Sequence, residues 1–110
     1  RLGRLLTLAL PTGDVGAERD FWAAIGLRAG DEHAEPWTHV TLSGEDISLT
    51  LHQRPHLREA ALHFACPDLG ALAAMLDDAE HPWESIELPG ASPTIRLRGP
   101  EGLACLVQGV

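Results

Sequence analysis

Histidine and arginine, more than carboxylates, are the residues of this 110-residue sequence whose spacing fits them for chemistry. His39, His52 and His63 occur in three segments of extended character, and three imidazoles can hold Zn²⁺ or act as a base near neutral pH. Arg96 and Arg98, two residues apart, would share one face of a strand and offer a fork for a carboxylate or phosphate. These residues suggest either a metal site or a ligand site.

The same residues also have simpler interpretations. His52 falls at a strand end beside Arg54, where a solvated histidine is common, and no carboxylate is predicted on the histidine face to orient a catalytic base. The arginine pair would equally suit a solvated strand paired with Glu87 or Glu101. Both interpretations of each group stay open at the level of sequence.

Apolar periodicity predicts the elements that must position these residues. In the first half we expect a strand at 5–10, a helix at 15–25 after the turn 11–14, a short strand at 27–31, and a hairpin of 37–42 with 47–52. Asp14 is placed to cap the helix, and Gly26 to end it.

The second half repeats this plan after about 55 residues. It predicts a strand at 60–66, a helix at 69–79 capped by Asp68, and strands at 85–88, 94–98 and 103–108. We therefore expect one domain, 1–110, made of module one (about 1–56) and module two (about 57–110).

Strand alternation divides the side chains between two faces of the predicted sheets. The apolar face should pack under the helices; it comprises Leu6, Leu8, Leu10, Val40, Leu42, Ile47, Leu49, Leu51, Leu62, Phe64, Ile95, Leu97, Cys105 and Val107. The opposite face carries Leu5, Thr7, Ala9, Trp37, His39, Thr41, Ser48, Thr50, His52, Ala61, His63, Thr94, Arg96, Arg98, Ala104, Leu106 and Gln108. Trp22 is predicted to pack in the core, and Trp83 to be a packed loop residue, a lid or a dimer contact.

Composition excludes several function classes. The formal net charge is −8, all eight basic residues are Arg, and there is no Lys, Tyr or Asn. Schiff-base catalysis and a phosphate-binding P-loop both need a Lys, so neither is available. Nucleic acid is an improbable partner for an acidic chain, because binding it requires phosphate neutralisation.

Nothing in the sequence suggests a membrane or a disulfide framework. No apolar run approaches the roughly 20 residues of a membrane span, and no cleavage-site pattern follows the apolar start, so we expect a cytoplasmic protein with no membrane partner. Cys66 and Cys105 lack metal-type spacing, and we expect two buried free thiols.

The repeat resembles the vicinal oxygen chelate superfamily, which contains glyoxalase I, extradiol dioxygenases, and the fosfomycin and bleomycin resistance proteins. The resemblance rests on residues 14–27 with Ile25-Gly26-Leu27, on 62–64 with Asp68-Leu69, and on the closing turn 99–102. It implies an α+β fold in which two βαβββ modules curl mixed sheets around a shared cleft with the helices outside. It also implies a homodimer.

The enzymes of that superfamily usually bind a divalent metal through four strand residues. The matching positions here are Leu5 or Thr7, Ser48, Ala61 and Leu106, and none is a good ligand for a hard divalent cation. The usual metal site is therefore predicted to be absent, and no cofactor is expected.

Two hypotheses follow for the cleft face. The first is a metal-independent protein of the bleomycin resistance type that captures a small organic ligand, such as an antibiotic, without catalysis. Its ligand-binding residues would be Trp37, with an indole that can cover a planar ligand, and His39, Ser48, Thr50, His52, His63, Arg96, Arg98 and Gln108. The alternative is a metal-dependent lyase, isomerase or dioxygenase that uses a displaced site at His39, His52 and His63.

Overall fold

The computed structural model describes residues 3–55, 57–87 and 92–109. Contacts divide the chain into two units: the first unit is Thr7–Ala60, and the second unit is Ala61–Val110 together with Arg1–Leu6. The N-terminal strand crosses the boundary, since its first residues are counted with the second unit.

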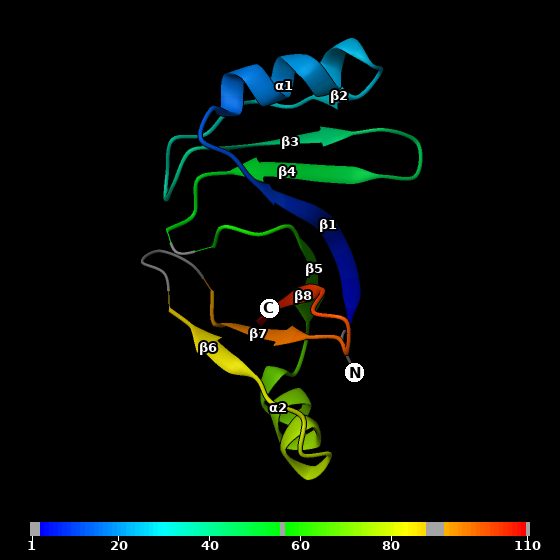
Figure 1. The fold of residues 1–110 in the computed structure, drawn as a ribbon, viewed down its shortest axis with the longest axis vertical. Helices are drawn as coiled ribbons and strands as arrows, with labels where there is room; N and C mark the ends of the chain where they lie inside the picture. The colour runs from blue at the N-terminus through cyan, green and yellow to red at the C-terminus, as the bar shows by residue number, and fades with distance from the viewer. Residues whose placement is uncertain (1–2, 56, 88–91, 110) are drawn as a thin grey trace. The chain divides into compact units, whose positions relative to one another are not determined.

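The order of elements confirms the predicted α+β fold with two βαβββ modules (Figure 1). The first run consists of β1 (Arg4–Pro11), α1 (Val15–Ala24), β2 (Arg28–Ala29), β3 (His39–Ser43) and β4 (Ser48–His52). The second consists of β5 (Ala61–Cys66), α2 (Leu69–Asp78), β6 (Glu84–Ile86), β7 (Thr94–Arg98) and β8 (Ala104–Gly109). The predicted boundaries shift by one or two residues at most ends, and residue 88 of the predicted strand 85–88 lies outside the described residues.

The strands of the two units follow the same mixed topology. In the first unit the strands follow the order β2-β3-β4-β1, and in the second the order is β5-β8-β7-β6. The first and last strands of each run pair in parallel, with Leu8 opposite Leu49 and His63 opposite Leu106. The other described pairs within each unit are antiparallel. This equivalence confirms the internal repeat.

Aspartate caps begin both helices as predicted. The Asp14 carboxylate accepts a hydrogen bond from the Ala17 N–H at 3.0 Å, and that of Asp68 accepts from the Ala71 N–H at 2.9 Å. Each bond satisfies one of the backbone donors that a helix leaves free in its first turn. After α1 the chain leaves through Gly26, whose φ of 118° suits glycine.

The two cores lie between each helix and the apolar face of its sheet. In the first unit the core comprises Val15, Val40, Leu42 and Leu51, packed by Leu10, Trp22 and Leu27. In the second unit it comprises Cys66, Leu72, Leu76, Ile95 and Val107, packed by Phe64, Leu69, Trp83 and Leu97. Strand alternation therefore assigned these strand residues to the correct face.

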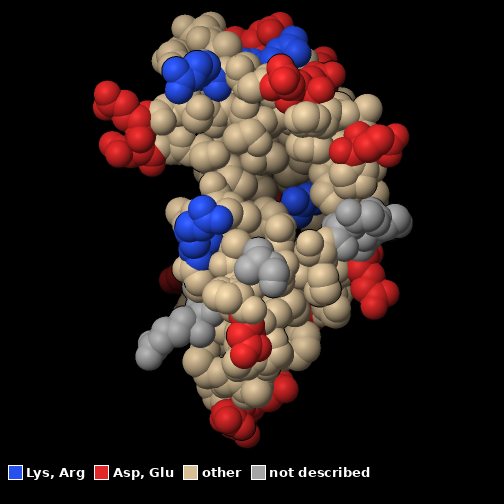
Figure 2. All heavy atoms as spheres, turned by 180° about the vertical axis from the view of Figure 1, so that it is seen from behind, with Lys and Arg blue, Asp and Glu red and all other residues tan. Residues whose placement is uncertain are grey.

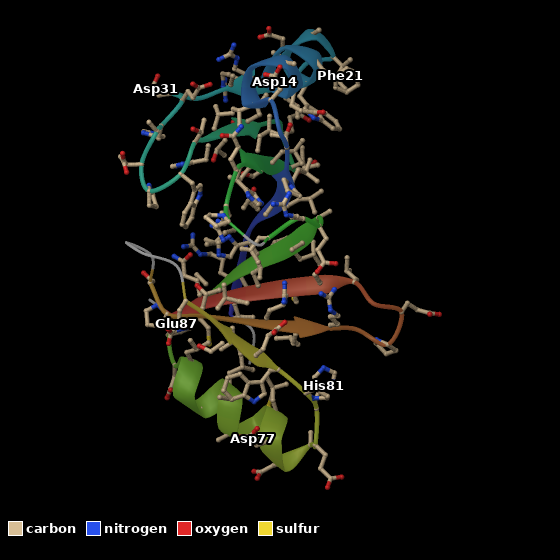
Figure 3. All side chains as sticks on the ribbon, turned by 60° about the vertical axis from the view of Figure 1, so that its left-hand side comes forward. Asp14, Phe21, Asp31, Asp77, His81 and Glu87 are labelled. Carbon is tan, nitrogen blue, oxygen red and sulfur yellow. The ribbon has the colours of Figure 1, made fainter. Side chains whose placement is uncertain are left out.

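One face of α1 packs against the sheet and the rest of the helix is exposed. Val15 and Trp22, seven residues apart, contact the sheet, so Trp22 packs in the core as predicted. Phe21 and Ile25 are 55% and 63% exposed, and Phe21 lies on the surface of α1 (Figure 3). Ile47, predicted in the core, is 48% exposed because it belongs to the hairpin turn before β4.

Acidic side chains on the helices are solvent-exposed. Glu18, Asp20, Asp77, Asp78 and Glu80 are all exposed. On the face drawn in Figure 2, Asp and Glu side chains are more numerous than the arginines, in keeping with the charge of −8. Within the described residues, no helix has the length and apolar character needed to cross a membrane.

Candidate functional site

A cluster of hydroxyl groups occupies the face of the first unit's sheet opposite α1. The Thr7 hydroxyl donates to the Ser48 carbonyl oxygen at 2.9 Å and accepts from the Ser48 Oγ at 3.3 Å and from the Thr50 Oγ1 at 3.0 Å. Thr41 Oγ1 lies 3.1 Å from Thr50 Oγ1. Three neighbouring strands thus supply one hydrogen-bonded network, and we name it the hydroxyl cluster.

The hydroxyl cluster includes Ser48, which the superfamily resemblance assigns to a metal-ligand position, and Thr7, one of the two residues that it offers for another. Sequence comparison left Leu5 or Thr7 as the first-strand position, and Thr7 is the residue that contacts Ser48. Neutral hydroxyls that bond one another are weak competitors for a divalent cation, which prefers imidazole, thiolate or carboxylate ligands. The residues of these two positions do not fit the metal.

In the second unit the other two metal positions are apolar and are not opposite each other. Ala61 pairs with Ala104, whereas Leu106 pairs with His63 across β5 and β8. His63 is 4% exposed. Among the described residues, no three His, Cys, Asp or Glu side chains are grouped closely enough to hold a metal ion.

The structure brings together a different histidine group from the predicted trio. His39 lies opposite His52 in the β3–β4 ladder, and the His39 ring stacks on that of His33 with 5.1 Å between centroids. His39 Nδ1 donates to the Trp37 carbonyl oxygen at 2.8 Å, which places the proton on Nδ1. His33 and His39 also exchange backbone hydrogen bonds, both at 2.9 Å. His63 belongs to the second unit.

His52 is buried, so the interpretation of a solvated strand-end histidine is wrong. The side chain is 1% exposed, and its Nδ1 accepts a hydrogen bond from the Arg54 backbone N–H at 3.1 Å. That acceptor role fixes the neutral tautomer with its proton on Nε2. His52 therefore anchors the start of the segment that follows β4.

A cavity of about 420 Å³ opens where β1 and β4 end. Parallel strands end at the same sheet edge, so the turn after β1 meets the segment after β4. Thr12 N–H donates to the His52 carbonyl at 3.0 Å, and Gln53 Nε2 donates to the Gly13 carbonyl at 3.2 Å. We call this cavity the strand-end pocket; its lining residues are Pro11, Thr12, Gly13, His52, Gln53, Arg54, Pro55, Leu57 and Arg58.

Arg54 is the chemically distinctive residue of the strand-end pocket, and sequence analysis did not select it. Its guanidinium stacks on the Trp37 ring, 4.7 Å from the centroid. The Nε atom is buried and has no hydrogen-bond partner among the described residues. Burial lowers the pKa of Arg54, although an arginine side chain remains charged at neutral pH. The face of Trp37 expected to cover a ligand is thus in contact with Arg54.

Arg96 and Arg98, the predicted arginine fork, lie in the second unit, and both are bonded to other residues of that unit. Arg96 forms an ion pair with Glu84 on the adjacent strand β6, a different partner from Glu87 or Glu101. The Arg98 guanidinium donates to the Gly102 carbonyl at 3.4 Å, and His81 Nε2 donates to the Arg98 carbonyl at 3.1 Å. These residues border a second cavity of about 430 Å³.

Trp83 borders that second cavity and is fixed within its unit. Its indole N–H donates to the Asp77 carboxylate at 2.9 Å, and its ring packs against the core under α2. Asp77 and His81 lie at the end of α2 and in the loop that follows (Figure 3). Of the three interpretations of Trp83, the structure supports loop packing.

Gln108, the remaining candidate, is half-buried opposite Thr94 in the β7–β8 ladder.

No protein-family model and no curated protein matches this sequence. Solved structures do match it. A glyoxalase/bleomycin resistance protein/dioxygenase superfamily member from Vibrio splendidus 12B01 is 14% identical, with 94% of this chain and 97% of that chain covered at a TM-score of 0.65. Methylmalonyl-CoA epimerase from Mycobacterium tuberculosis is 12% identical, with 96% and 87% covered at a TM-score of 0.67.

The chain has the fold of the glyoxalase/bleomycin resistance/dioxygenase superfamily. The predicted resemblance to the vicinal oxygen chelate superfamily is thereby confirmed at the level of the fold. A catechol 2,3-dioxygenase is also similar, at 19% identity and a TM-score of 0.64, with 96% of this chain but 39% of that chain covered. At these identities the comparisons show a shared fold only. The activities named for those proteins are not assigned to this chain.

Proposed function

We propose that this chain is a metal-independent small-molecule-binding protein and that the strand-end pocket receives the ligand. The proposal is supported above all by the chemistry of the site: a cavity of about 420 Å³ lies beside strands in which the superfamily resemblance assigns the metal positions to Leu5 or Thr7 and to Ser48, none of them a good metal ligand. Volumes of this size are typical of pockets for small organic ligands. An antibiotic or a metabolite is the class of ligand we expect.

Metal analysis tests the metal-independent part of the proposal. Protein purified without chelator is analysed for bound elements, and its melting temperature is followed with Zn²⁺, Ni²⁺, Mn²⁺ and Fe²⁺. We expect less than 0.1 equivalent of metal and no shift in the melting temperature. A metal that bound the folded state would raise that temperature. Stoichiometric metal together with a saturable shift would instead favour the alternative, a metal-dependent lyase, isomerase or dioxygenase.

Equilibrium dialysis tests the binding part. A panel of antibiotics and polar aromatic metabolites is dialysed against the protein at micromolar concentration. We expect at least one compound to bind, with affinity reduced tenfold or more by Gln53→Leu, which removes the amide that joins the segment after β4 to Gly13. Thr41→Val in the exposed part of the hydroxyl cluster is the matched control. No binding across the panel contradicts the proposal.

A further inference from the structure

The strand-end pocket is locally basic in an acidic protein. The chain carries a net charge of −8, yet the described lining of this pocket includes Arg54 and Arg58 and no Asp or Glu. Asp14, which follows the lining residue Gly13, directs its carboxylate to the Ala17 N–H as a helix cap. The local charge therefore favours a negatively charged ligand even though the whole protein does not.

Arg54 is held in place before any ligand binds. The guanidinium carbon lies over the Trp37 ring, 4.7 Å from its centroid, and the backbone N–H of the same residue is bonded to His52. A guanidinium has donors in a rigid fork that matches a carboxylate, so a contact that restricts its motion reduces the entropy lost on binding.

One donor of Arg54 lacks a partner among the described residues. The Nε atom is buried and makes no hydrogen bond there. A buried donor without a partner destabilises a folded protein, and native proteins retain such donors rarely. The protein itself therefore does not use the full donor capacity of this guanidinium, and a carboxylate that binds it would form charge-assisted hydrogen bonds.

The pocket is larger than a simple anion requires. Its volume is about 420 Å³, and Pro11, Pro55 and Leu57 contribute apolar surface to its lining. A ligand that fills it would carry an apolar body beside its charged group. We infer that the strand-end pocket binds small organic carboxylates, with the Arg54 guanidinium holding the carboxylate. This inference rests on the proposed function and specifies its ligand class.

Side-chain NMR tests the inference on the whole chain. The ¹⁵N-labelled protein is titrated with benzoate and cyclohexanecarboxylate, with benzamide and cyclohexanecarboxamide as neutral counterparts, and separately with inorganic phosphate. We expect both carboxylates to shift the Arg54 Nε–H resonance and the indole N–H of Trp37, with at least tenfold weaker binding of the amides. The indole N–H of Trp83, which is bonded to Asp77, should not move.

Variants separate the role of Arg54 from general charge. Arg54→Lys keeps the positive charge but loses the planar fork, and we expect it to weaken carboxylate binding at least tenfold. Arg54→Met should abolish carboxylate binding and leave amide binding unchanged. Arg28→Gln, on the exposed strand β2, changes net charge by the same amount and should have no effect. The dispersion of each amide spectrum verifies that the variant is folded.

Each outcome is decisive. Equal binding of acids and amides overturns the inference while leaving small-molecule binding in place. Shifts with phosphate but not with carboxylates overturn it in favour of a phosphate site. If no probe shifts the Arg54 resonance at 10 mM, the pocket does not recognise carboxylates; the dialysis panel then decides the proposed function separately.

Discussion

Thr7 in β1 donates its hydroxyl hydrogen to the carbonyl oxygen of Ser48 in β4, with 2.9 Å between the two oxygens. The same hydroxyl oxygen accepts from Ser48 and Thr50, and Thr7 is 9% exposed. This one side chain therefore connects the members of the hydroxyl cluster across the parallel strand pair.

Replacing Thr7 by Val should lower the free energy of unfolding by about 1–2 kcal/mol. The methyl group preserves the shape of the side chain, but two hydroxyl donors lose their acceptor in a mostly buried setting. Urea denaturation measures the loss. Thr41→Val, exposed at the edge of the same cluster, should cost less than about 0.5 kcal/mol. Equal losses in the two variants would show that Thr7 is not the centre of the cluster.

The two aspartate caps should contribute similarly to stability. Asp14→Ala and Asp68→Ala each remove the acceptor for one first-turn N–H, and each should cost about 1 kcal/mol, within the range 0.5–2. Thermal and urea unfolding measure both. Asp14→Asn and Asp68→Asn retain a capping oxygen and should cost much less; if they matched the alanine variants, the effect would come from charge and not from the hydrogen bond.

Gly3 should not tolerate a side chain. Its φ is 88°, and a Cβ built on it would lie 2.0 Å from the carbonyl oxygen of Ala65 in β5, where backbone must move to accommodate it. We expect Gly3→Ala to cost about 3 kcal/mol or more in the free energy of unfolding. Gly99→Ala is the control, because nothing lies within 4 Å of its built Cβ. A Gly3→Ala protein as stable as Gly99→Ala would contradict the close approach.

Turn residues, caps and strand alternation were sufficient to predict the order of elements. These signals are local, so Asp14, Asp68 and the alternating residues of β3 and β4 could be interpreted without tertiary information. The packing of Trp22 was predicted, but the exposure of its neighbour Phe21 was not, because periodicity alone does not rank two adjacent aromatic residues. Trp22 contacts the sheet, and Phe21 meets its ring edge-on at 5.1 Å.

The pocket was less accessible to sequence reasoning than the fold. Parity places Thr7, Ser48 and Thr50 on one sheet face, and the hydroxyl cluster confirms that placement. Arg54 lies after the last residue of β4, where alternation no longer assigns a face, and its contact with Trp37 joins two loops. The sequence offered one signal, the topology. Because β1 and β4 are parallel and end at the same sheet edge, the segments that follow them lie close together.

The Arg96–Glu84 ion pair should matter little to stability. It joins neighbouring strands, but the Glu84 side chain is 54% exposed, so water and salt screen the attraction. We expect Glu84→Gln to cost less than about 1 kcal/mol in 50 mM salt and almost nothing in 1 M salt. Urea denaturation at the two salt concentrations measures this. A larger loss that persists in 1 M salt would indicate a hydrogen bond in place of a screened ion pair.

Cys105 should react slowly with alkylating reagents in the folded protein. Cys66 is buried and Cys105 is half-buried. Burial raises the pKa of the Cys105 thiol, so less reactive thiolate is present at pH 8 than in an unfolded chain. We therefore expect iodoacetamide labelling of Cys66→Ala at pH 8 to be at least threefold slower in buffer than in urea.

The same raised pKa fixes the direction of a pH effect on stability. Because the folded state keeps the Cys105 proton at a pH where the unfolded chain loses it, its contribution to stability is complete below the unfolded pKa of about 8.5 and declines as pH rises through the folded value. The urea concentration at the unfolding midpoint of Cys66→Ala should decrease as the pH is raised from 8 to 10. Adding Cys105→Ala, which has no titrating thiol, should reduce that fall. An identical fall in both proteins would assign the pH dependence to another group.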